Sequence, residues 1–300
     1  MDNVTHSLVG LNLAHAFFKR RFPEAVPALL LSSNLPDIDG AVLLSHSPLA
    51  VTWRRTFGHS VLLLPLWALV LAWLLRRRYR SSSLIALWLL CLLGAYTHLF
   101  FDLINSFGVV VFWPFSAWRP ELAMVFIIDV CMLALLAFPH PLWFWKSGRA
   151  RVSQVCRWSS GLVAGYLLFC AVNRVYAKWK LDHSFGGARA SFSYVFPEPL
   201  GPHRWRCVTR GTDDSYREFL FHTLTDRADP AIVVPSFPND PAVPSARASP
   251  AGRRLEWFFK APVWRPEPDG VHAYDLRFRS IVIKREGSFE YVLTPDGRVL

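Results

Sequence analysis

The stretch that decides the fold is LIALWLLCLLGAYTHLFFD, residues 84–102. Residues 84–101 are almost entirely apolar and include no Asp, Glu, Lys or Arg. Their length is about that of a helix crossing a bilayer core of roughly 30 Å. The stretch therefore predicts a membrane-spanning helix, and His98 and Asp102 stand out as polar residues near its end.

Further apolar runs fill the first 177 residues of the chain. Three of them are similarly long: residues 60–75, 122–138 and 158–177. Residues 4–18 and 25–35 are less clearly apolar and are expected to form a helical hairpin. A composition of 52% hydrophobic and 18% charged residues excludes a disordered or fibrous protein. Residues 1–177 are thus predicted to be a mainly α, polytopic membrane helix bundle with five to six hydrophobic helices.

The basic residues are distributed unevenly. The net charge of +11 would suggest nucleic-acid binding in a soluble protein. Eleven of the 15 basic residues in the first 177 lie in three clusters, at 19–21, 76–80 and 146–157. Alternating helices place these clusters on one side of the membrane, which is the cytoplasmic side because short cytoplasmic loops are enriched in Lys and Arg. The charge is therefore an orientation signal, and no nucleic-acid partner is expected.

Residues 178–300 have a different amino-acid composition. They contain 18 basic and 15 acidic residues and most of the prolines, as in a water-facing domain. Apolar and polar residues alternate as in strands, for example at 256–260, and the Pro-rich stretch 229–250 is expected to be a long flexible loop. A small, largely β, extracytoplasmic domain is predicted.

With this orientation, seven residues that could bind a metal fall near the outer face of the bundle: His6, Asp37, Asp39, His59, His98, Asp102 and Asp129. His98 and Asp102 are four residues apart, which puts them on one helical face, one turn apart, as two ligands of one ion require. Asp37 and Asp39 lie in a turn and could offer carboxylates to one ion or bridge two. Histidine nitrogen with carboxylate oxygen suits a divalent metal ion, with zinc expected first and manganese or iron(II) as alternatives.

Simpler roles exist for each residue taken singly. A histidine at a helix end can reach the membrane interface, and His98 with Asp102 could be a hydrogen-bonded pair that holds two helices together. Arg54 and Arg55, just before His59, could bind an anionic substrate group such as phosphate, or anchor a helix end among lipid head groups. The convergence of residues from five separate segments favours a metal or catalytic cluster.

Short motifs in residues 1–140 resemble one family. They are Thr5-His6-Ser7-Leu8, Asn34-Leu-Pro-Asp37-Ile-Asp39, Arg55 followed by His59-Ser60, Gly94 to Asp102 with Gly108, Trp113-Pro-Phe115 and Ile128-Asp129. This set is similar to that of the YdjM type of predicted membrane-bound metal-dependent hydrolases. The resemblance implies that His6, Asp37, Asp39, His59, His98 and Asp102 form the family's polar cluster, with Asp129 as an optional seventh member. The sequence departs from the pattern at Gly58, where a threonine commonly precedes the histidine, and at Val130, where a proline often follows the aspartate.

The expected protein is a multi-pass metal-dependent hydrolase of the bacterial inner membrane, with its site at the outer face and its C-terminal domain in the periplasm. One or two ions would be held by His6, Asp37, His59, His98 and Asp102. Asp39 or Asp129 would act as a general base or orient a ligand. Membrane lipids are the expected partners, and a lipid or lipid-linked phosphoester near Arg54 and Arg55 is the expected substrate.

Two other classes of protein remain open. One is a non-enzymatic membrane protein whose polar cluster packs helices and whose C-terminal domain binds a partner. The other is a transporter that carries protons or metal ions through the cluster, which would need a polar path through the inner half of the bundle.

Overall fold

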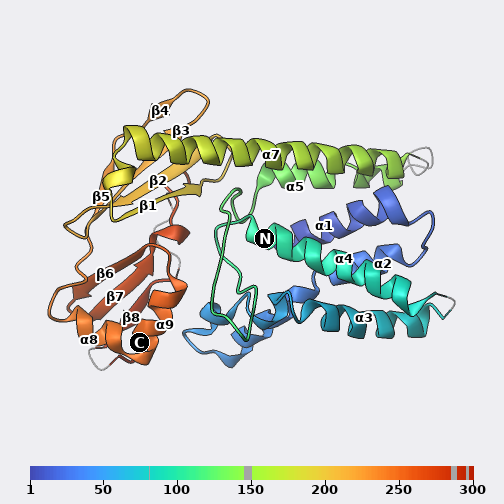
Figure 1. Cartoon of the computed structure of the whole chain (residues 1–300), viewed down its shortest axis with the longest axis horizontal. Coiled ribbons are helices and arrows are strands. Elements are labelled where there is room, and N and C mark those ends of the chain that lie inside the picture. Colours follow the sequence, from blue (N-terminus) through green and yellow to red (C-terminus); the bar gives the residue numbers. More distant parts are fainter. Residues whose placement is uncertain (81, 145–150, 285–288, 295–296) are drawn as a thin grey trace. The chain divides into compact units, whose positions relative to one another are not determined.

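The computed structural model describes residues 1–80, 82–144, 151–284, 289–294 and 297–300 (Figure 1). Two compact units are formed: Met1–Leu44 with Trp53–Phe169, and Ser45–Thr52 with Cys170–Leu300. The boundary between Phe169 and Cys170 falls inside one continuous helix, α7 (Val152–Ser184). The predicted domains, 1–177 and 178–300, meet within the same helix.

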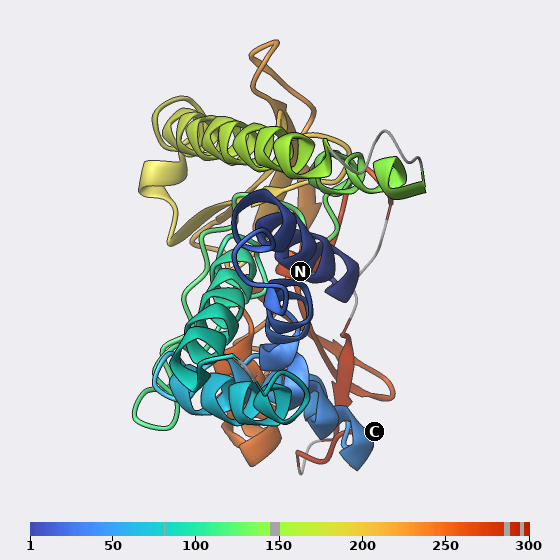
Figure 2. The same ribbon diagram turned by 90° about the vertical axis from the view of Figure 1, so that its right-hand side faces the viewer.

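The chain before α7 is mainly helical. Its α-helices are α1 (Asn3–Leu13), α2 (Ala25–Ser32), α3 (Leu64–Arg78), α4 (Leu84–Leu103) and α5 (Val130–Ala137). A π-helical turn, Ala14–Phe18, extends α1, and 3-10 segments occupy Leu35–Ser45, Ala50–Trp53, Phe57–His59 and His140–Phe144. Helices α1 and α2 contact each other as the expected hairpin, and α4 contacts both α2 and α3 (Figure 2).

Small residues allow the hairpin and α4 to approach closely. A Cβ atom at Gly94 of α4 would collide with the side chain of Ser32, and one at Gly10 of α1 would collide with the hydroxyl of Ser33. Glycine and serine at such positions let helix backbones pack at short distance, as is common between membrane helices. The end of α2 therefore lies beside the turn of α4 that carries His98.

Two helices are long and apolar enough to span a membrane, α4 and α7, as predicted for residues 84–101 and 158–177. A third span results if the 3-10 region Ala50–His59 and α3 are joined across their bend of 72°. The described residues thus form a helix bundle with two to three candidate spans, and the expected five to six are not confirmed.

The apolar run 122–138 is not one helix, so this prediction was wrong. Its first part has no regular structure and pairs with the end of α4, since the backbone N–H of Met124 donates to the carbonyl of Ile104 at 2.6 Å. Helix α5 begins only after Asp129, whose carboxylate caps it by accepting from the N–H of Met132 at 2.9 Å. Apolar composition therefore occurs here in irregular backbone as well as in helix.

The C-terminal part is an antiparallel sheet domain, as predicted. One sheet contains β1 (Phe192–Pro197), β2 (Arg204–Arg210), β3 (Tyr216–His222), β4 (Arg227–Ala228) and β5 (Ile232–Val234). Its order is β1-β2-β3-β4, and β5 also pairs with β3. The second sheet has the order β6-β7-β8 and contains β6 (Pro262–Glu267), β7 (Gly270–Asp275) and β8 (Tyr291–Leu293).

Two local predictions in this domain were wrong. Residues 256–260 are not a strand, because α9 (Pro250–Phe258) extends into them. Ser249 caps this helix by accepting from the N–H of Gly252 at 3.0 Å, and Pro250 fits its first turn, so strong start signals override the alternation. The stretch 229–250 is not one flexible loop either, since it contains β5 and α8 (Val243–Ala248).

Candidate metal centre

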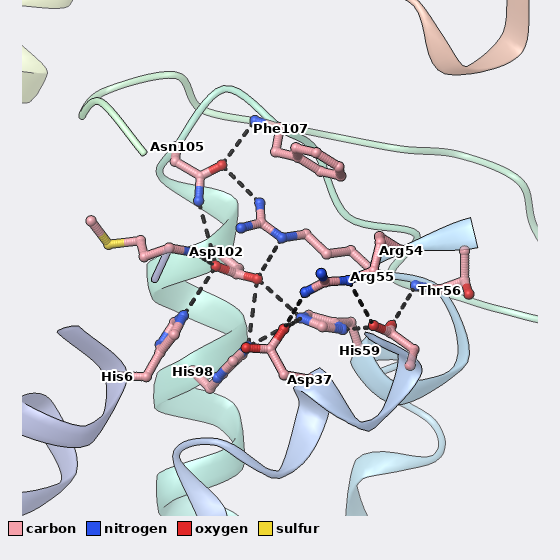
Figure 3. A network of polar contacts seen from close by, with 12 residues as sticks. His6, Asp37, Arg54, Arg55, Thr56, His59, His98, Asp102, Asn105 and Phe107 are labelled. Carbon is pink, nitrogen blue, oxygen red and sulfur yellow. Dashed lines mark hydrogen bonds and ion pairs between the residues drawn. The ribbon is translucent and has the colours of Figure 1, made fainter. Parts of the chain in front are cut away.

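Helix α4 presents His98 and Asp102 one turn apart on a buried face, as predicted (Figure 3). The Nε2 atom of His98 lies 3.5 Å from Oδ2 of Asp102. Burial of a carboxylate and an imidazole costs free energy unless partners satisfy them. Side chains from other segments supply those partners.

His59 enters from the 3-10 turn before α3 and is oriented by Asp39. The Oδ2 atom of Asp39 accepts hydrogen bonds from Nδ1 of His59 and from the backbone N–H of Thr56, both at 2.9 Å. Burial raises the pKa of Asp39, but the neighbouring His59 and these hydrogen bonds lower it more, so this pKa lies below its usual value. The ionised Asp39 thus directs the Nε2 atom of His59 toward α4.

Gly58 explains one departure from the family pattern. A Cβ atom at this position would collide with the carbonyl oxygen of Pro36, so the turn that carries His59 packs directly on the segment Leu35–Ser45. Any larger residue at Gly58 requires a shift of one backbone against the other. Glycine is therefore the residue that fits this close approach.

The outer partners of His59 and His98 determine where their ring protons lie. The Nδ1 atom of His98 is 2.7 Å from the carbonyl oxygen of Ser33, which only accepts, so this Nδ1 carries the proton. The Nδ1 atom of His59 likewise faces the carboxylate of Asp39. With both Nδ1 atoms hydrogen-bonded, the two Nε2 atoms are left to face each other at 3.1 Å (Figure 3). Either a proton on Nε2 of His59 or a metal ion can occupy the position between them and the carboxylate of Asp102.

Asp37 completes a group of four residues whose ligand atoms all lie within 4.8 Å of one another: Asp37, His59, His98 and Asp102. The Nε2 atom of His59 is 3.0 Å from Oδ2 of Asp102 and 4.0 Å from Oδ1 of Asp37. Ligand atoms around a tetrahedral zinc ion, with bonds of about 2.0 to 2.2 Å, are roughly 3.3 to 3.6 Å apart. Among the described residues, Oδ2 of Asp37 is buried without a hydrogen-bond partner. The donor set and this unpartnered oxygen both fit a divalent ion.

His6 of α1 reaches the other side of Asp102. Its Nε2 atom lies 3.2 Å from Oδ1 of Asp102, and its ring stacks on that of His98 with centroids 3.6 Å apart. The amino group of Met1 also pairs with Asp102. The Nδ1 atom of His6 is buried and has no hydrogen-bond partner in the described part of the chain. His6 is therefore brought to the edge of the cluster, where it contacts two members of the group.

Arg54 and Arg55 both pair with carboxylates of the cluster. The buried Arg55 places Nε 2.7 Å from Oδ2 of Asp102 and donates to Oδ1 of Asn105 at 2.8 Å. Arg54 donates to Oδ1 of Asp37 at 3.0 Å, and its side chain is 28% exposed. Arg54 is therefore the more exposed of the two arginines, since the side chain of Arg55 is only 7% exposed.

Asn105 belongs to the site although sequence reasoning missed it. Its Oδ1 accepts from Arg55 and from the backbone N–H of Phe107, both at 2.8 Å, while its Nδ2 donates to Asp102 at 3.4 Å. Asn105 follows Asp102 by three residues, just beyond the end of α4, and this closeness in sequence was the signal that could have identified it. Asn105 thus holds Arg55 against Asp102.

The described hydrogen bonds of Asp129 lie outside the cluster. Besides capping α5 through Met132, its carboxylate accepts from the hydroxyl of Tyr166 in α7, at 2.9 Å to Oδ1 and 2.8 Å to Oδ2. The structure thus gives Asp129 a helix-capping and helix-linking role. Its expected role as a general base stays a prediction.

Comparisons with known proteins point to one family. A family model described as "YdjM inner membrane protein" matches residues 1–177, more than half of the chain. The Bacillus subtilis (strain 168) protein described as "Uncharacterized protein YfhP" is 22% identical over 305 residues, which cover 97% of this chain and 90% of that protein. No solved structure matches. The matched region contains every residue of the cluster, and the chain therefore belongs to the YdjM inner membrane protein family.

Proposed function

We propose that this protein is a metal-dependent hydrolase of the inner membrane. The observation that carries the proposal is the pair of Nε2 atoms of His59 and His98, which face each other at 3.1 Å while each Nδ1 is already hydrogen-bonded. Asp37 and Asp102 add carboxylate oxygens to the same small volume. Imidazole with carboxylate is a ligand set for zinc, and manganese or iron(II) accepts it as well.

The residues of the cluster divide the remaining tasks. A divalent ion bound by the four ligands would supply Lewis acidity, which lowers the pKa of water and polarises a phosphoryl oxygen. Asp39 orients His59 as the carboxylate partner of a ligand histidine. The partly exposed Arg54 is placed to bind an anionic oxygen.

The proposed substrate is a lipid or lipid-linked phosphoester, cleaved at the outer face of the membrane. Membership of an inner-membrane family supports a substrate that resides in the bilayer. The three basic clusters support a cytoplasmic location for the opposite end of the helices. Periplasmic placement of the sheet domain follows from the same argument.

Metal content tests the proposal directly. Protein purified in detergent without chelator is expected to contain stoichiometric zinc, manganese or iron by inductively coupled plasma mass spectrometry. His98→Gln and Asp102→Asn are expected to lose it. His15→Gln is the matched control, because His15 is also a buried histidine of the first unit but lies in the turn after α1. Wild-type protein without metal, or equal loss in the His15 variant, would contradict the proposal.

A structural role is the second candidate, and one observation favours it. Both Arg55 and the amino group of Met1 pair with Asp102, so this buried carboxylate has positive partners within the chain. Under this alternative, Asp37→Asn and His98→Gln lower the melting temperature while the wild type and both variants contain no metal. The metal content of the wild type and of His98→Gln therefore distinguishes the two candidates.

A further inference from the structure

A cavity of about 220 Å³ lies in the first unit, between α1, α4, α5 and α7. Its walls are almost entirely apolar and include Val9, Leu13, Phe101, Leu136, Val163 and Leu167. A dry apolar cavity of roughly 150 Å³ is enough to bind benzene in another protein. The volume here is therefore sufficient for a segment of hydrocarbon.

The polar residues that line this cavity are occupied elsewhere. The hydroxyl of Thr97 donates to the carbonyl of Leu93 at 2.7 Å, and that of Ser160 donates to the carbonyl of Cys156 at 2.9 Å. The Nδ2 atom of Asn12 donates to the carbonyl of Leu136. Among the described residues that line the cavity, the Oδ1 atom of Asn12 is the one buried side-chain polar atom without a hydrogen-bond partner. A buried water needs about two to four polar partners, so this lining favours an apolar occupant over ordered water.

One end of the cavity adjoins the metal cluster. The lining residues Thr97 and Phe101 immediately precede His98 and Asp102 on α4. Each lies about 100° around the helix axis from the cluster residue that follows it. On α1, Val9 follows His6 by three residues and so lies on the same face, about one turn further along. From Phe101 the lining continues back along α4 to Leu93, a distance of about 12 Å at 1.5 Å per residue. A molecule extended along this cavity therefore has one end beside the cluster.

The cavity opens between α4 and α7. Leu93 and Ala164 line it and are themselves exposed. Both belong to the two helices that are long and apolar enough to span a membrane, so the opening lies along membrane-spanning surface. At such a depth the surrounding medium is hydrocarbon, and lipid chains are the molecules available to enter.

We propose that this cavity holds the hydrocarbon chain of a lipid whose phosphate-bearing head group reaches the metal cluster. The assignment of the head group rests on the proposed function, whereas the binding of the chain rests on the cavity alone. The chain could belong to a phospholipid or to a polyprenyl phosphate, because both join a long hydrocarbon to a phosphate. In either case the substrate is drawn sideways from the bilayer.

Photo-crosslinking of the full-length protein in vesicles tests the inference. One arm uses phosphatidylglycerol with a diazirine in its acyl chain, and the other uses a diazirine-bearing polyprenyl phosphate. Mass spectrometry is expected to locate crosslinks from one of these probes on the buried lining residues Val9, Phe101 or Leu136, and the probe that crosslinks identifies the source of the chain. Crosslinks confined to the outward surface of α7 with both probes would overturn the inference.

A filling substitution and its neighbour provide the matched comparison. Ala164→Phe projects a ring into the cavity and is expected to reduce crosslinking about tenfold, equivalent to about 1.4 kcal/mol of binding. Gly165→Phe adds the same ring one residue later, where an added Cβ atom meets no atom within 4 Å, and is expected to leave crosslinking unchanged. Ser160→Leu, a second filling change on α7, is expected to act like Ala164→Phe. Equal crosslinking in all three variants would contradict the inference.

Metal analysis of the same preparations separates the two proposals. Crosslinks in the cavity of a protein that contains no metal would refute the hydrolase and leave the chain-binding cavity standing. Bound metal without crosslinks in the cavity would refute the chain-binding cavity and leave the metal site of the hydrolase standing. Ala164→Phe is expected to retain the wild-type metal content, because Ala164 is not part of the cluster.

Discussion

Replacement of Asp39 by asparagine tests how the site is organised. Within the four-residue group, Asp39 contacts one histidine nitrogen, Nδ1 of His59. Its carboxylate accepts hydrogen bonds from this nitrogen and from the N–H of Thr56, both at 2.9 Å. Asparagine is nearly isosteric and keeps one acceptor oxygen, but it loses the negative charge that strengthens both hydrogen bonds. Loss of such a carboxylate partner typically weakens metal binding about 10- to 100-fold, or about 1.4 to 2.7 kcal/mol. Asp39→Asn is expected to fall within this range.

Zinc affinity can be measured in detergent by competition with a chromophoric chelator. Asp129→Asn is the matched control, because the carboxylate of Asp129 bonds to Met132 and Tyr166 instead. Its zinc affinity is expected to equal that of the wild type. Unchanged affinity in Asp39→Asn, or equal weakening in both variants, would refute the proposed orienting role of Asp39.

Three further predictions concern the sheet domain and the topology. Arg206 is buried between two glutamates, so Arg206→Ala is expected to lower the free energy of unfolding by about 3 to 5 kcal/mol in denaturant titrations, and a loss below 1 kcal/mol would contradict this. Burial lowers the pKa of His272, but Glu290 and neighbouring carboxylates raise it more, so its stabilisation is present below about pH 6.5 and lost as the pH rises through the raised pKa. His272→Gln should remove this pH dependence from melting temperatures measured between about pH 5 and pH 8, and an unaltered profile would exclude His272 as its source. Alkaline phosphatase fused after Lys180 is expected to be active and after Arg78 inactive, and the opposite pattern would place the site in the cytoplasm.

Local patterns predicted the parts of the fold that depend on neighbouring residues. The apolar run in α4, the hairpin of α1 and α2, and the pair of His98 and Asp102 follow from length and helical spacing. The same reasoning failed at 122–138, because apolar composition does not specify the backbone conformation. There, hydrogen bonds to the end of α4 and the cap formed by Asp129 decide where the helix begins.

The sequence by itself determined that this protein has a membrane helix bundle, a sheet domain and a set of histidines and aspartates suited to a metal. Only the tertiary structure decided which of those residues meet. His59 and His98 are 39 positions apart in the chain, and His6 and Asp102 are 96 apart, so their contacts depend on how α1 and the turn Phe57–His59 pack against α4. Spacing along a chain determines which residues share a helix face, whereas packing between helices determines what each face contacts.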